Sequence, residues 1–194
     1  RLRRAGYGEG ELRICHLNFA GARKLLPEAG GGFDFILADL GVSSMQIDNP
    51  QRGFSFKSPG PLDLRLNPER GIPASAYLAK LNAAALAKIL TVNADEPHAA
   101  AIAEIVAAGR DGISTTLQFA DAIRAGLQPL HLPQEEIARS LQRCFQALRI
   151  AVNEEFSALD QFLQSLPFLL KPNGRAAILA FHSGEDRRGK HAVA

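Results

Sequence analysis

The stretch FDFILADLGVSS, which begins at Phe33, limits the fold more than any other part of the sequence. Its first six residues form a short run that is apolar on both faces, which is typical of a strand in a parallel sheet covered on both faces. An acid, a glycine and two serines follow at once. A buried strand that ends in polar, turn-forming sequence predicts an α/β fold with a ligand site beyond the strand.

The rest of the chain extends this α/β pattern. ELRICH (11–16) and RAAILAF (175–181) are predicted strands, and the turn signal KPNG precedes the second. A capping-box pattern, Thr115 with Gln118, predicts a helix start. Helices are expected at 74–90, 97–108 and 115–125, and through SLQRCFQALRIAVNEEFSALDQFL, whose apolar residues recur every three or four positions. The sequence therefore predicts a parallel sheet with a helical block inserted between its strands.

Composition excludes several classes of protein. The 194 residues are 46% hydrophobic, enough for one domain, or for one domain with a large insertion. No apolar run approaches the roughly 18 residues of a membrane span, and the first residues lack the apolar segment of a signal peptide, so a cytoplasmic location is expected. Cys15 and Cys144 lie far apart without metal-ligand spacing, so both are expected to be buried thiols and no metal site is predicted.

Positive charge gathers at the two ends of the chain. Residues 1–24 contain six Lys or Arg against two acids, and 175–190 contain four against two, although the whole chain carries only +2. Lys and Arg contact phosphates, so this distribution is compatible with a nucleic acid partner. Solvated chain ends are the alternative, and charge alone leaves both open.

Asp39 is the leading candidate for a ligand contact. It follows the predicted strand directly, where a carboxylate can accept hydrogen bonds from a ligand hydroxyl or amine. Gly41 would let the backbone approach a ligand closely, and Ser43 and Ser44 add donors. An acid at a strand end can also simply cap a turn or a helix, and that alternative stays open.

Five motifs in order, DLGVSSMQID, RGFSF, GPLDLRLNP, FQALRIAVNEE and FHSGEDR, lie between Asn18 and Arg187. Together they resemble the ribosomal RNA small subunit methyltransferase H family, also called MraW. The resemblance implies a Rossmann-like class I methyltransferase sheet, incomplete at its N-terminus, with an inserted all-helical domain. The expected division is 1–62 and 143–194 for the two parts of the methyltransferase domain, and 63–142 for the helical, substrate-recognising domain.

The resemblance implies methyl transfer from S-adenosyl-L-methionine to the 4-amino group of a cytidine in the decoding, P-site region of 16S rRNA. It places Phe19, Asp39 and Gln46 in the cofactor site. A cytidine amine is a weak nucleophile, so a catalyst must orient it and accept hydrogen bonds from its protons. Asp39, Ser43, Ser44 and His182 are the predicted catalytic residues, with backbone carbonyls as an alternative to the Asp39 carboxylate.

Reaching a base in structured RNA requires unstacking it, which aromatic and guanidinium planes can offset. The predicted substrate-binding residues come from two motifs and are Arg52, Phe54, Phe56, Arg65, Ser183, Glu185 and Arg187. The two aromatics of RGFSF could instead pin an extended loop to the core, and both interpretations stay open. A Ser/His hydrolase is disfavoured because no GxSxG motif is present.

Two other classes of function are weighed against this one. The family opens with a strand, a glycine-rich loop and a second strand, and the chain is expected to begin after them. A catalytically silent RNA-binding or ribosome-assembly module is therefore the alternative. A DNA amino-methyltransferase ranks last, because DLGV does not match the DPPY-like tetrad usual in those enzymes. Exposed sheet edges could also pair two copies into a homodimer.

Overall fold

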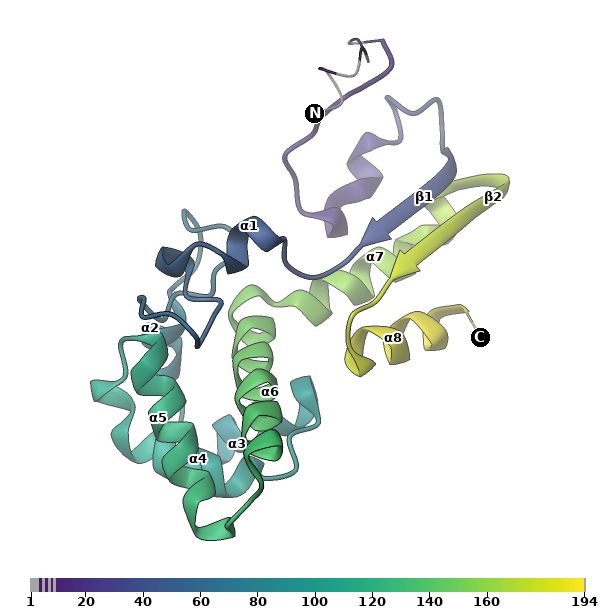
Figure 1. The fold of residues 1–194 in the computed structure, drawn as a ribbon. Helices are drawn as coiled ribbons and strands as arrows, with labels where there is room; N and C mark the ends of the chain where they lie inside the picture. The colour runs from purple at the N-terminus through teal and green to yellow at the C-terminus, as the bar shows by residue number, and fades with distance from the viewer. Residues whose placement is uncertain (1–3, 5, 7, 9, 194) are drawn as a thin grey trace. The chain divides into compact units, whose positions relative to one another are not determined.

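Two strands form the sheet of this protein. The computed structural model describes residues 4, 6, 8 and 10–193, and in it β1 (Phe33–Asp39) pairs with β2 (Leu170–Leu179). Figure 1 shows the two arrows pointing the same way, so the pair is parallel. The strand predicted at 33–38 is confirmed. The strand predicted at 175–181 is confirmed over 175–179, but β2 already begins at Leu170, so the turn predicted at KPNG is wrong. The strand predicted at 11–16 is wrong: that segment has no regular structure, and no neighbouring strand in the described chain supplies the ladder hydrogen bonds it would need.

The predicted burial of β1 is also wrong. Phe35 and Leu37 are 58% and 59% exposed, although their sequence pattern is that of a strand covered on both faces. α7 (Glu155–Leu169) runs beside the two strands and buries its own apolar residues, including Phe162 and Leu166. Pattern alone predicts how well a strand suits burial, whereas neighbouring elements decide whether it is buried.

Local signals account for the helix boundaries. Asn82 accepts from the amide of Ala85 at 2.8 Å and begins a new helix, so the single helix predicted over 74–90 is wrong. The capping box of Thr115 and Gln118 is confirmed. The helices other than α7 are α1 (Ser44–Ile47), α2 (Ala74–Leu78), α3 (Ala83–Ala94), α4 (Ala99–Gly109), α5 (Thr116–Leu127), α6 (Gln134–Asn153) and α8 (Ser183–Val193).

The predicted long helix is broken after Asn153, where Glu154 takes a left-handed conformation with φ of 52°. α6 ends there and α7 begins at Glu155. The apolar stripe predicted for this stretch is confirmed as core on both sides of the break, since Phe145, Leu148 and Phe156 are among its buried members.

Contacts divide the chain into two compact units. One contains the stretch up to Ala38 together with Ala158–Ala177, and the other contains Asp39–Ser157 together with Ile178–Ala194. The second unit holds the main hydrophobic core, where α3, α4, α5 and α6 pack on one another. Its fully buried side chains include Leu86, Leu90, Ile102, Val106, Phe119, Ile123 and Leu148. The predicted division at residues 62 and 142 stays a prediction.

Among the residues that the structure describes, no helix combines the length and apolar character needed to cross a membrane. Cys144 is buried on α6, as predicted, and burial raises the pKa of its thiol. The same prediction for Cys15 is wrong, because Cys15 is exposed. Its segment forms no strand, so no neighbouring strand of the described chain covers it.

Candidate functional site

β1 and β2 both end at the carboxyl-terminal edge of the sheet, and the two segments that follow these strands lie together. The amide of Leu40 donates to the carbonyl oxygen of Leu179 at 3.2 Å. Gly41 has φ of 87°, which favours glycine, and a Cβ built there would lie 3.6 Å from the ring of Phe181. The loop that starts at Asp39 and the segment that leads to His182 therefore meet within the second unit.

Asp39 presents an exposed carboxylate at this edge. In the described part of the chain its side chain makes no hydrogen bond or ion pair, so it caps neither a turn nor a helix. Ser43 and Gln46 are occupied with each other, because Gln46 Oε1 accepts from the Ser43 amide at 2.9 Å and lies 3.4 Å from its hydroxyl oxygen. The amide nitrogen of Gln46 has no partner among the described residues. Ser44 is exposed at the start of α1.

Arg52 and Arg65 both brace the loop to which they belong. Arg52 donates from one terminal nitrogen to the carbonyl oxygens of Arg65, at 2.7 Å, and Leu66, at 3.0 Å. Arg65 forms a two-point pair with Asp63, at 2.8 and 2.7 Å, and this pairing lowers the pKa of Asp63. Their predicted role in substrate binding stays a prediction, but neither guanidinium is free of contacts within the protein.

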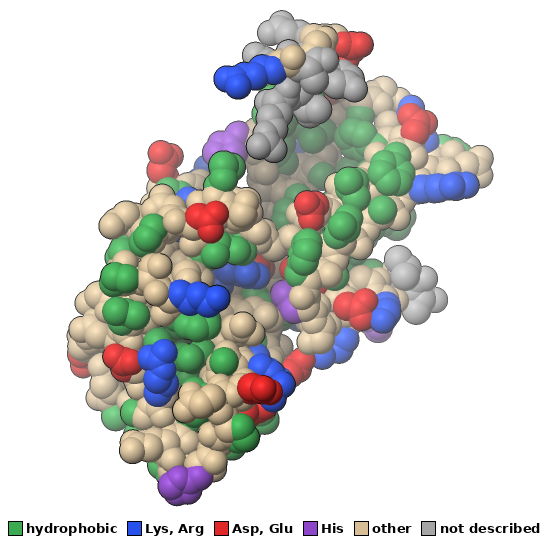
Figure 2. Space-filling view, viewed as in Figure 1, with side chains coloured by type: hydrophobic (Ala, Val, Ile, Leu, Met, Phe, Trp, Pro, Cys, Tyr) green, Lys and Arg blue, Asp and Glu red, His purple; other side chains and the backbone are tan. Residues whose placement is uncertain are grey.

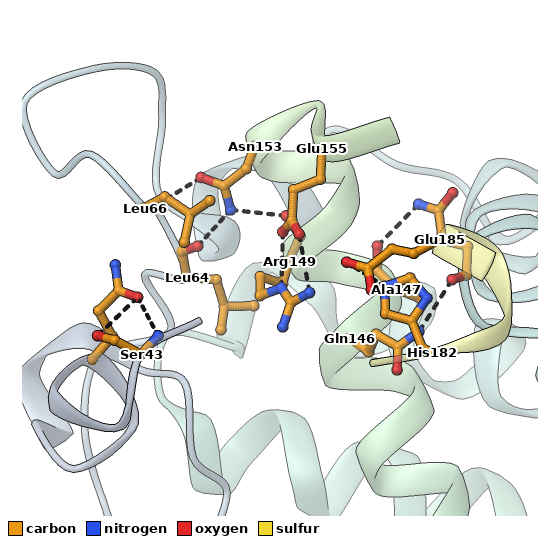
Figure 3. A network of polar contacts seen from close by, with 12 residues as sticks. Ser43, Leu64, Leu66, Gln146, Ala147, Arg149, Asn153, Glu155, His182 and Glu185 are labelled. Atoms are coloured by element: carbon orange, nitrogen blue, oxygen red, sulfur yellow. Dashed lines mark hydrogen bonds and ion pairs between the residues drawn. The ribbon is translucent and has the colours of Figure 1, made fainter. Parts of the chain in front are cut away.

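Asn153 ties the same loop to the end of α6 (Figure 3). Its Oδ1 accepts from the amide of Leu66 at 2.7 Å, and its Nδ2 donates to the carbonyl oxygen of Leu64 at 2.7 Å. Arg149, one turn earlier, pairs with Glu155 at 2.8 and 3.0 Å. No role was predicted for these residues from the sequence. The sequence feature that could have indicated them is the set of polar residues that interrupts the apolar stripe of FQALRIAVNEE.

The segment after β2 is held by an acid of its own helix. The buried carboxylate of Glu185 accepts from the amide of Phe181 at 2.8 Å, and its other oxygen lies 3.3 Å from His182 Nε2. Burial raises the pKa of Glu185, but the nearby His182 and the Phe181 amide outweigh that effect and the net result is a lowered pKa. Neither ring nitrogen of His182 has a well-aligned hydrogen bond, and its ring packs against Phe156 at 5.8 Å.

Ser183 and Arg187 contact Asp95, which follows α3. The Ser183 hydroxyl donates to Asp95 at 2.8 Å, and Arg187 pairs with both carboxylate oxygens at 2.9 and 3.1 Å. The hydrogen bonds from Arg187 and then Ser183 lower the pKa of Asp95. This three-residue contact, which we call the Asp95 clasp, joins the start of α8 to the helical core. Sequence analysis did not single out Asp95.

A pocket of about 360 Å³ opens between the loop after β1 and one face of α6. Phe54 and Phe56, the two aromatic residues of RGFSF, line the pocket, and both also pack against the core. Both interpretations of these rings, pocket wall and loop anchor, are therefore compatible with the structure. Its lining side chains include Val42, Ile47, Phe54 and Phe56, and, from α6, Gln142, Phe145, Gln146 and Arg149.

Phe19 lies in the other unit, on a 3-10 helix (Phe19–Leu25) that Asn18 caps through a 2.9 Å hydrogen bond. Its ring meets the ring of Phe162 edge to face at 5.5 Å, and the residue is 40% exposed. Within the described residues no group of three or more His, Cys, Asp or Glu is arranged to hold a metal ion.

The chain is similar to known proteins over nearly its whole length. A family model described as the MraW methylase family matches residues 4–194. The chain is 53% identical over 192 residues to ribosomal RNA small subunit methyltransferase H 2 of Alkaliphilus metalliredigens, covering 96% of the chain and 55% of that protein. It is 50% identical over 198 residues to ribosomal RNA small subunit methyltransferase H 1 of Agathobacter rectalis, covering 100% and 56%. The chain thus spans about half the length of the curated relatives it matches.

Proposed function

The chain belongs to the MraW methylase family, and from that premise we propose that it takes part in methylation of small-subunit ribosomal RNA with S-adenosyl-L-methionine as methyl donor. The proposed target is the 4-amino group of a cytidine in the decoding, P-site region of 16S rRNA. The names of its relatives support the ribosomal substrate, and the motif resemblance supports the cytidine.

One structural observation carries the proposal. An exposed carboxylate without a partner in the described chain, Asp39, stands where the two parallel strands end, beside the segment that holds His182. Ligands of open α/β sheets bind at this kind of edge. A Rossmann-like sheet with the helical residues 63–142 inserted in it is part of the same proposal, because those helices lie in sequence between β1 and β2.

The residues present suit a nucleoside-containing cofactor. Asp39 can accept hydrogen bonds from its amine or hydroxyl groups, and the unpartnered amide nitrogen of Gln46 can donate one. The partly exposed aromatic ring of Phe19 suits stacking of a purine. The motif resemblance assigns these three residues to S-adenosyl-L-methionine, which when bound supplies a methyl group on a positively charged sulfur.

The chain's own contribution to chemistry would be to orient the cytidine amine. The amine lone pair is delocalised into the ring, so acceptors for the amine protons make the nitrogen more reactive and fix its direction. The Asp39 carboxylate or a neighbouring backbone carbonyl is the proposed acceptor. Ser43, Ser44 and His182 belong to the segments that follow the two strands and are proposed to help position the base.

Partners and location follow from this proposal. The partner would be 16S rRNA or the small ribosomal subunit, and a cytoplasmic location follows because ribosomes are assembled there. Pairing of two copies through the sheet stays a prediction.

Calorimetric titration of S-adenosyl-L-methionine into the chain tests the cofactor site. We expect saturable binding that Asp39→Ala weakens at least about tenfold, because a charge-assisted hydrogen bond is lost. Asp48→Ala is the matched control, since Asp48 is another exposed acid nine residues further on. Transfer of a labelled methyl group to purified small-subunit particles is the second readout. RNA binding by a folded chain that binds no cofactor would contradict the proposal and favour the silent RNA-binding module.

A further inference from the structure

Leu64 lies in a strained bend of the backbone between Asp63 and Arg65. It has φ of 60°, in the left-handed region that residues other than glycine rarely adopt, and its side chain is 1% exposed. Its amide donates to the carbonyl oxygen of Arg52 at 3.1 Å, and its carbonyl oxygen accepts from Asn153 at 2.7 Å. Backbone strain persists only where the surroundings hold it, and it is concentrated at functional sites. The bend therefore points to a function for the residues beside it.

Asp63 holds Arg65 through three hydrogen bonds. Its Oδ1 accepts from the Arg65 amide at 3.0 Å and from the Arg65 Nε at 2.8 Å, and its Oδ2 accepts from the Arg65 Nη2 at 2.7 Å. The two side chains are only 17% and 19% exposed, so this is not a solvated surface pair. A two-point pair aligns the flat guanidinium with the carboxylate. The orientation of the Arg65 side chain is therefore set by Asp63.

Arg52, Asp63 and Arg65, which we call the Asp63 cluster, carry two positive charges against one negative charge. The hydrogen bonds from Arg65, together with the charges of Arg65 and Arg52, lower the pKa of Asp63 against the effect of burial, so its carboxylate stays ionised. Each guanidinium has five N–H groups. Asp63 accepts from Nε and Nη2 of Arg65, and Nη1 has no partner among the described residues. The cluster therefore has a net charge of +1 and an oriented arginine with donors left over.

We propose that Asp63 is a positioning residue for RNA binding, and that it orients Arg65 so that the remaining N–H groups of the guanidinium donate to a phosphate of the RNA backbone. The inference rests on the proposed function, which supplies the RNA partner, and it names a group that holds this partner. A phosphate suits the cluster because its oxygens only accept hydrogen bonds and carry negative charge. Phosphate contacts position a nucleic acid and carry no sequence information. The contact would therefore place the RNA strand without selecting its bases.

Fluorescence anisotropy of a short labelled single-stranded RNA, titrated with the full chain, tests the inference through the sign of the change. Removing an acidic charge ordinarily strengthens binding to a polyanion. Asp63→Asn should instead weaken binding about fivefold, the size of one net hydrogen bond, because Arg65 loses its defined orientation. Asp121→Asn is the matched control, since Asp121 pairs with Arg124 at 2.7 Å on the surface. Its binding should be unchanged or stronger.

Two changes at Arg65 show whether Asp63 acts through it. Arg65→Gln should reduce the logarithmic salt dependence of binding by about 0.7, the size of one phosphate contact on a single strand. In that background Asp63→Asn should no longer weaken binding, because the side chain that it orients is gone. Arg65→Lys keeps the charge but cannot form the two-point pair, so it should bind RNA more weakly than the unmodified chain. Arg65→Lys decides the question if circular dichroism shows that Asp63→Asn does not fold.

Several results would overturn the inference. They are no RNA binding by the unmodified chain, undiminished binding by folded Asp63→Asn, weakening by Asp63→Asn that persists in the Arg65→Gln background, and full affinity of Arg65→Lys. Transfer of a labelled methyl group to small-subunit particles separates the inference from the proposed function. The expected RNA binding without methyl transfer would sink only the proposed reaction, whereas methyl transfer with undiminished Asp63→Asn binding would sink only the role of Asp63.

Discussion

The helical core and the sheet differ in how far they bury leucine side chains. In α6, Leu148 is 0% exposed between helices of its own unit, whereas Leu37 in β1 is 59% exposed. Figure 2 shows apolar side chains, in green, on the molecular surface in this view. Helices that follow one another in sequence can cover each other through short connections, whereas a parallel strand needs neighbours from distant parts of a chain. Helices that are close in sequence can therefore bury the side chains of the core, whereas burial of a strand depends on distant parts of a chain.

A leucine-to-alanine substitution in each region tests this contrast in burial. Leu148→Ala is expected to lower the free energy of unfolding by about 2 to 5 kcal/mol, because it removes buried methyl groups and leaves a cavity. Leu37→Ala is expected to change it by less than about 0.5 kcal/mol, as for other exposed positions. Urea unfolding followed by circular dichroism measures both values. A large loss for Leu37→Ala would show that the strand is covered in solution, as pairing of two copies would do.

Asn153 tests whether the loop after β1 belongs with the helical core. Asn153→Ala leaves the amide of Leu66 and the carbonyl of Leu64 without their partner, at a cost of about 1 to 3 kcal/mol in the free energy of unfolding. Hydrogen exchange at the Leu66 amide should become faster. Asn67→Ala is the control, because Asn67 only accepts from the amide of Glu69 two residues away. Unchanged exchange at Leu66 would show that other contacts hold the loop.

The Asp95 clasp is expected to contribute less than Asn153, and it tests whether α8 belongs with the helical core. Asp95 has a lowered pKa in the folded chain, so its carboxylate stabilises the fold above the unfolded pKa and loses that contribution as pH falls through the lowered value. Because the pair with Arg187 is exposed to solvent, Asp95→Asn should cost less than about 1 kcal/mol at neutral pH.

The difference between the unmodified chain and Asp95→Asn should shrink as pH falls below about 4, where unfolded aspartates take up protons. Urea unfolding at a series of pH values measures it. Asp111→Asn, at an exposed acid, is the control and should show no such trend. A difference that grows with acidity would mean that Asp95 is not stabilised as a carboxylate.

Features set by neighbouring residues were open to prediction from the sequence. The capping box at Thr115 rests on residues three apart, and the apolar stripe of α6 and α7 rests on helical spacing. Asp39 follows a strand-forming run directly. Each depends only on local geometry. The family was recognisable for a related reason, since its motifs are short and lie in a fixed order.

The sequence by itself thus determined the strand at β1, most of the helices, the acid at the strand's end and the family. Only the tertiary structure decided that Phe35 and Leu37 are exposed within this chain, that Asn153 holds a loop 87 to 89 residues away, and that Asp95 meets Arg187 across 92 residues. Such contacts depend on how helices pack, and no local pattern records which distant backbone group a polar side chain will meet.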